Sequence, residues 1–67
     1  MKIRKFREAA GLTMKELAGK VGVSVATVSR WESGEDLPAA GRLPLLAGAL
    51  DCSIDALFGR DSPPAAG

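Results

Sequence analysis

The most informative stretch of this sequence is TMKELAGKVGVSVATVSRWE, which covers residues 13–32. Thr13 and Glu16 have the spacing of a capping box, in which the threonine hydroxyl accepts a hydrogen bond from the Glu16 amide while the Glu16 side chain reaches back to the threonine amide. The pattern predicts a helix over residues 14–20. Gly22 then ends this helix, because glycine adopts the left-handed backbone conformation without strain.

A second helix follows this glycine after a very short turn. Ser24 is suited to cap its N-terminus, and Gly34 closes it after Ser33. Two helices that meet at a steep angle through so short a turn need a small residue where they touch and apolar inner faces. The small residue is Ala18, and the apolar residues are Leu17, Val21, Val23, Val28 and Trp31. The stretch therefore predicts a helix-turn-helix unit.

One further helix is expected before this unit. Ile3, Phe6 and Ala10 recur at helical spacing, so residues 2–10 read as an amphipathic helix that Gly11 stops.

Two more helices are expected after the unit. Residues 34–41 read as a loop, and Pro44 fits only the first turn of a helix, so the next helix spans residues 42–50. Ser53 caps a last short helix over residues 54–58.

The chain of 67 residues is long enough for one small domain. We expect an all-α domain of five helices over residues 1–59 and a disordered tail over residues 60–67, which lack periodicity. The single cysteine, Cys52, excludes an internal disulfide. No apolar run approaches the ~18 residues of a membrane span and no secretory signal follows the N-terminus, so a cytoplasmic protein with no membrane contact is expected.

Charge is distributed unevenly along the chain. Residues 1–30 contain seven basic and two acidic side chains, a balance of +5, whereas residues 31–67 contain two basic and six acidic ones, a balance of −4. The asymmetry indicates a polyanionic partner for the first half. The alternative is that these charges form solvated helix faces.

Composition argues against an enzyme. The chain has no histidine and no tyrosine, and Cys52 has no second cysteine with which to form a metal site. We therefore expect no catalytic residue, metal or cofactor. The chain also lacks asparagine and glutamine, the side chains that read adenine through two hydrogen bonds.

A set of residues along most of the chain matches one known family. The set comprises residues 12–18, 22–24 and 27–34, with Pro38, Leu43, Leu46, Ala47, Ala49, Leu50, Ser53, Asp55 and Leu57. Together they resemble the phage repressor and Cro-like (XRE) helix-turn-helix transcriptional regulators. The resemblance implies a compact lambda-repressor-like domain of five helices, in which the second and third form the unit that reads DNA. It also implies a bacterial or phage protein that works as a homodimer on a palindromic operator.

The second helix of the unit, about residues 24–33, is expected to read the major groove of double-stranded DNA with its N-terminal residues. Its outer face carries Val25, Ala26, Ser29 and Arg30, which we expect to contact bases. Arg30 can form a bidentate pair with guanine, and the two apolar residues can touch thymine methyl groups. The alternatives for Arg30 are a phosphate contact or a solvated charge.

Phosphate contacts are expected near helix N-termini, which bind anions through free amides and the helix dipole. The residues concerned are Thr13, Met14, Lys15, Ser24, Thr27 and Arg42. Family members often have glutamine where this chain has Met14, so only the backbone amide of Met14 can serve. Glu35 and Asp36 stand in the following loop, where the family often has basic residues, and they would repel DNA that came close.

Two structural roles are also expected. The resemblance places Arg7 and Glu32 in a partly buried salt bridge between the first and third helices. Ile54, Leu57 and Phe58 are more apolar than the docking of one short helix requires, so we expect a dimer interface there. The alternative is that all three close the core.

The expected function is therefore sequence-specific DNA binding by a transcriptional regulator, with no small-molecule effector because 67 residues leave no room for an effector domain. One alternative is an antitoxin or restriction–modification control protein of the same fold. Another is a protein-interaction module that has kept the fold and lost DNA binding, which the acidic loop favours.

Overall fold

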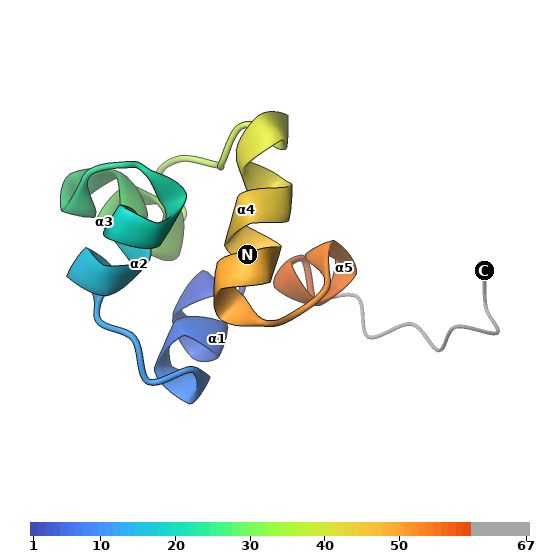
Figure 1. The fold of residues 1–67 in the computed structure, drawn as a ribbon. Coiled ribbons are helices and arrows are strands. Elements are labelled where there is room, and N and C mark those ends of the chain that lie inside the picture. Colours follow the sequence, from blue (N-terminus) through green and yellow to red (C-terminus); the bar gives the residue numbers. More distant parts are fainter. Residues whose placement is uncertain (60–67) are drawn as a thin grey trace, which may run out of the picture.

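The computed structural model describes residues 1–59 as five α-helices (Figure 1). The helices are α1 (Ile3–Ala9), α2 (Met14–Val21), α3 (Val25–Ser33), α4 (Leu43–Leu50) and α5 (Ile54–Leu57), with a short 3-10 helix, η1 (Ala40–Arg42), before α4. This part of the chain contains no strand, so the predicted all-α class is confirmed. The tail predicted over residues 60–67 lies outside the described residues. Within residues 1–59, no helix has the length and apolar character to cross a membrane.

Local signals fix the start of α2 and both helix ends at the turn between α2 and α3. The capping box is present: the Glu16 amide donates to the Thr13 hydroxyl at 3.1 Å, and the Thr13 amide donates to Glu16 Oε1 at 2.9 Å. Helix α2 ends at Gly22, whose φ of 79° lies in the left-handed region. Helix α3 begins after Ser24, whose hydroxyl accepts from the Thr27 amide at 3.2 Å.

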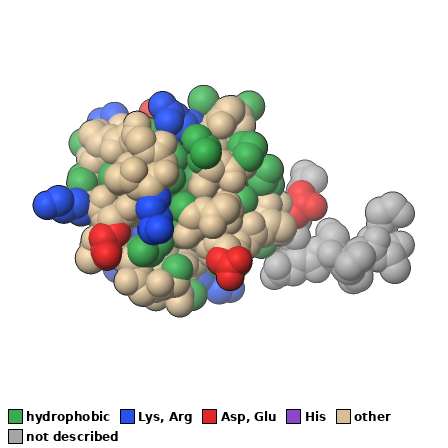
Figure 2. All heavy atoms as spheres, viewed as in Figure 1, with side chains coloured by type: hydrophobic (Ala, Val, Ile, Leu, Met, Phe, Trp, Pro, Cys, Tyr) green, Lys and Arg blue, Asp and Glu red, His purple; other side chains and the backbone are tan. Residues whose placement is uncertain are grey.

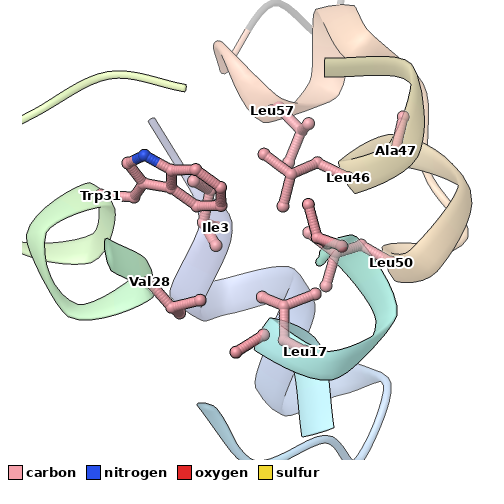
Figure 3. Packing of buried hydrophobic residues seen from close by; sticks show 10 residues of the cluster. Ile3, Leu17, Val28, Trp31, Leu46, Ala47, Leu50 and Leu57 are labelled. Atoms are coloured by element: carbon pink, nitrogen blue, oxygen red, sulfur yellow. The ribbon is translucent and has the colours of Figure 1, made fainter. Parts of the chain in front are cut away.

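The core lies where all five helices converge (Figure 3). Each helix contributes one side chain that is fully buried, and these are Ile3, Leu17, Val28, Leu46 and Leu57. Trp31 of α3, only 4 % exposed, packs beside Ile3. The helix-turn-helix unit is thus fixed to the remaining helices through one shared centre.

Helix α1 differs from its prediction. It is shorter than residues 2–10, and Ala10, expected on the inner face, is exposed. The buried face instead consists of Ile3 and Arg7, with Phe6 partly buried. The prediction was wrong because apolar spacing overlooks a charged residue that becomes buried through a partner elsewhere in the chain.

The C-terminal helices lie close to their predicted positions. Pro44 stands in the first turn of α4, as expected, but the helix starts at Leu43 because η1 occupies the preceding residues. The predicted loop over residues 34–41 therefore ends in η1. Helix α5 ends one residue before Phe58, which serves as its C-cap.

Candidate nucleic-acid interface

One face of α3 is turned to solvent. Val25 is 43 % exposed, and Ala26, Ser29 and Arg30 are exposed as well. The opposite face of the same helix is buried in the core. The four residues predicted to contact bases therefore lie together on one accessible surface.

Two hydroxyl groups and a guanidinium meet at the N-terminal turn of α3. The hydroxyls of Ser24 and Thr27 are hydrogen bonded at 3.0 Å, and Arg30 Nη2 donates to the Thr27 hydroxyl at 3.3 Å. Long side chains on a helix extend toward its N-terminus, so the Arg30 charge lies toward the end that is expected to enter the groove. A positive charge beside hydroxyls at a helix N-terminus can bind a phosphate or the acceptors on a base edge.

The N-terminus of α2 presents backbone amides. Within residues 1–59, the amides of Met14 and Lys15 have no acceptor, as is usual for a first helical turn. The Met14 side chain packs against the core, whereas Lys15 is exposed. Hydrogen bonds from Thr13 hold the pKa of Glu16 below its ordinary value, so Glu16 stays charged. Anion binding at this helix end therefore depends on the two free amides and the Lys15 ammonium.

Arg42 holds the end of α2 against the start of α4. Its Nη1 donates to the Val21 carbonyl at 2.8 Å, which satisfies one of the carbonyls left free at the C-terminus of α2. The same nitrogen lies 3.5 Å from the position of a Cβ on Gly22. Sequence reasoning assigned Arg42 only to phosphate and missed this bond, because it joins residues 21 positions apart and no local pattern marks it.

Arg7 ties α1 both to α3 and to the loop before α2. Its Nε donates to Glu32 Oε2 at 2.7 Å and its Nη2 to Glu32 Oε1 at 3.3 Å, and the two side chains are 11 % and 6 % exposed. The hydrogen bond to Glu32 holds the pKa of Arg7 above its ordinary value. A third bond, from Nη1 to the Leu12 carbonyl at 2.8 Å, was not predicted from the sequence.

The helix-turn-helix family model matches residues 3–57. The chain belongs to the helix-turn-helix family. It is 41 % identical over 54 residues to the cryptic phage CTXphi transcriptional repressor RstR of Vibrio cholerae serotype O1, a match that covers 81 % of this chain and 48 % of that protein. It is 32 % identical over 63 residues to the HTH-type transcriptional regulator YobD of Bacillus subtilis (strain 168), with 94 % of this chain and 56 % of that protein covered.

These matches confirm the resemblance to the XRE type of helix-turn-helix protein. The chain spans about half the length of the two curated relatives. No solved structure matches it with significance.

The acidic loop of this helix-turn-helix domain follows α3. Glu35 and Asp36 are exposed, and the Asp36 amide donates to the Arg30 carbonyl at 3.3 Å. The two carboxylates thus stand at the C-terminus of α3, the end away from the N-terminal turn where base contacts are expected.

The three residues predicted at a dimer interface of this helix-turn-helix domain separate into two groups. Ile54 is 37 % exposed and Phe58 is 50 % exposed, whereas Leu57 is fully buried. Leu57 lies beside Leu46 in the core (Figure 3), so it has no surface to offer a second copy and the prediction for it is corrected. The sequence could not separate the three, because a helix of four residues is too short for periodicity to define its inner face.

The part of the chain that the structure describes contains no group of three His, Cys, Asp or Glu side chains placed to hold a metal ion. Burial raises the pKa of the Cys52 thiol, which keeps it protonated and therefore a poor nucleophile.

Proposed function

We propose that this domain binds double-stranded DNA with α3 in the major groove and thereby regulates transcription. The observation that carries the proposal is the exposed outer face of α3, whose opposite face is fixed in the core. The relatives support a regulatory role, because RstR is a transcriptional repressor and YobD an HTH-type transcriptional regulator. Both come from bacteria, which supports the bacterial cytoplasm as the place of action.

Base reading rests on Arg30. Its guanidinium is the only side chain on the outer face of α3 that can form two hydrogen bonds with guanine. Val25 and Ala26 supply methyl groups that suit thymine, and Ser29 supplies one hydroxyl. A surface with so few polar groups reads few base pairs directly, so sequence-dependent DNA shape contributes to specificity.

Phosphate binding flanks this surface. The free amides of α2, the Ser24–Thr27 turn and the remaining N–H groups of Arg42 are all suited to phosphate oxygens. Thr13 contributes a hydroxyl that keeps its own hydrogen after it accepts from the Glu16 amide. The full proposed set is Thr13, Met14, Lys15, Ser24, Thr27 and Arg42.

We also propose that the domain acts as a homodimer on a palindromic operator, with no small-molecule effector. A twofold axis would place two copies of α3 about 34 Å apart, one turn of DNA. The exposed Ile54 and Phe58 supply an apolar surface on α5 for such contacts.

A second candidate function is a protein-interaction module without DNA binding. It is favoured by the exposed carboxylates of Glu35 and Asp36, which lower the affinity of the surface around the C-terminus of α3 for a polyanion.

The salt dependence of binding tests the proposal. Random-site selection would supply a duplex, and fluorescence anisotropy of the full chain would give the affinity at several salt concentrations. If Lys15 and Arg42 each neutralise one phosphate, the slope of log K against log salt is expected to be about −2 per monomer, since each phosphate neutralised contributes ~0.9. No salt-sensitive binding to any duplex at micromolar protein would exclude DNA binding and favour the interaction module.

A further inference from the structure

Helix α4 is apolar on its exposed side as well as on its buried side. Its sequence, LPLLAGAL, contains no charged or hydrogen-bonding side chain. One face is buried in the core, whereas Pro44, Leu45 and Gly48 are exposed, and Leu45 as a residue is 50 % exposed. Figure 2 shows hydrophobic side chains gathered over the upper part of α4. A helix that is apolar all round is normally covered on all sides, so one side of α4 lacks its cover.

Gly48 makes a notch in this exposed face. A Cβ built on it would meet no atom within 4 Å, so nothing inside the domain requires glycine there. Glycine inside a helix is less favourable than alanine, because it loses more backbone entropy on folding. The folded monomer therefore gains nothing from Gly48. A contact surface does benefit from glycine, because another backbone or side chain can approach it closely.

We infer that the outer face of α4 is a contact surface for a second copy of this chain, which rests on the homodimer of the proposed function and names an additional surface for it. Leu45 and Gly48 lie three residues apart on one face and equally far from the midpoint of Leu46 and Ala47. A twofold axis through this midpoint sets two α4 helices antiparallel, so that Leu45 packs over Gly48 of the partner subunit and the reverse contact forms as well. A half-exposed side chain and a notch on the same face are self-complementary in this arrangement.

A second copy fits this face better than DNA does. The face offers no cation for a phosphate, and two copies of it bring no like charges together because α4 carries none. Antiparallel packing also places the opposite ends of the two helix dipoles side by side. Eight residues of helix are only about 12 Å long, so the contact is smaller than a standard protein interface and association in free solution is weak.

Sedimentation equilibrium of the full chain tests the inference. Leu45→Glu buries a charge in the contact and is expected to weaken self-association at least about tenfold. Gly48→Ala is expected to raise the melting temperature, because alanine is the better helix former. It is also expected to weaken self-association, because its methyl group fills the notch. Leu37→Glu is a matched control for Leu45→Glu, because Leu37 is also an exposed leucine, at 65 %, but lies in the loop before η1 and outside both proposed contact surfaces. Circular dichroism would establish that each variant is folded.

Weaker association of both α4 variants, with unchanged association of Leu37→Glu, supports the inference, whereas an equal loss in Leu37→Glu overturns it. Association that Leu45→Glu leaves unchanged overturns it, and so does a parent chain that stays monomeric at the highest attainable concentration. Anisotropy on a duplex with a single half-site separates this result from the proposed function. Loss of the α4 contact leaves salt-dependent binding to that duplex in place, whereas failure of the proposed function removes it.

Discussion

Helices α1–α3 and helices α4–α5 are held by different kinds of interaction. In the first group, directional bonds set the geometry: the Thr13–Glu16 capping box, the Ser24 cap and the pair of Arg7 with Glu32. In the second group, burial of Leu46, Ala47 and Leu50 dominates, and neither ion pair found in residues 1–59 involves α4 or α5. Burial is non-directional, whereas hydrogen bonds and ion pairs fix angles. The unit proposed to read DNA is therefore oriented by bonds in addition to the core, to which all five helices contribute.

Glu32→Ala is expected to have the largest effect on this molecule. It leaves the Arg7 guanidinium buried without a carboxylate, and such a loss typically costs about 3–5 kcal/mol. Since small domains are only marginally stable, the variant is expected to be largely unfolded at 25 °C. Circular dichroism with thermal melting would measure the effect.

Glu35→Ala is the control for this variant. It removes an exposed carboxylate with no ion pair in the described structure, so its stability is expected to stay within about 0.5 kcal/mol of the parent. A Glu32→Ala protein that melts within a few degrees of the parent would show that burial alone orients α3.

Arg30→Ala tests whether α3 reads bases. We expect it to lose about 1–3 kcal/mol of discrimination at one base pair, with an unchanged melting temperature because Arg30 is exposed. Lys15→Ala is the comparison: it is expected to weaken all duplexes equally and to reduce the salt slope by ~0.9. Selected-site and mismatched duplexes in an anisotropy titration would separate the two. If Arg30→Ala lowers the salt slope and leaves base preference intact, Arg30 contacts phosphate instead.

The sequence predicted the parts of the fold that local rules determine. The capping box, the left-handed Gly22 and the Ser24 cap each depend on residues within four positions of one another, and all three are present. Pro44 likewise marked the first turn of α4. These signals were sufficient to predict the helix-turn-helix unit and the exposed outer face of α3.

Contacts between distant residues could not be predicted from local rules. Arg42 reaches the Val21 carbonyl, 21 positions away, and this bond depends on how the helices pack. For the same reason Ala10 was expected inside and is exposed, while Leu57 was expected at an interface and is buried. The bond from Arg7 to the Leu12 carbonyl spans only five positions, but it crosses the turn after α1, which helical periodicity does not describe. The partner of Arg7 was found only through the family resemblance, since no pattern of spacing links it to Glu32.

Thr13→Ala would remove half of the capping box and is expected to destabilise the domain by about 1 kcal/mol. The loss arises because the Glu16 amide can no longer donate to the threonine hydroxyl. Urea unfolding at neutral pH would measure it. Ser53→Ala at the cap of α5 is the counterpart in the other group of helices. A larger loss from Ser53→Ala than from Thr13→Ala would reverse the comparison between the two groups.

The pH dependence of stability is a second test of the capping box. Hydrogen bonds from Thr13, first of all from its backbone amide, hold the pKa of Glu16 below its ordinary value of 4.5. The charged carboxylate therefore stabilises the fold above this value, and the contribution is lost as the pH falls through the lower folded-state pKa. Between about pH 5 and pH 3, the parent is expected to lose more stability than Glu16→Gln. Equal losses in the two proteins would mean that the Glu16 carboxylate contributes nothing to folding.

Gly19→Ala is expected to have the smallest effect, and it stabilises. Gly19 lies inside α2, and a Cβ built on it would meet no atom within 4 Å, as at Gly48 in α4. Alanine is a better helix former by about 0.5–1 kcal/mol, so both variants should unfold at higher urea concentration than the parent. Only Gly48→Ala should also weaken self-association, because α2 presents no apolar outer face. If Gly19→Ala weakened self-association as much as Gly48→Ala does, the loss could not be assigned to the outer face of α4. The contact surface would then have to lie elsewhere.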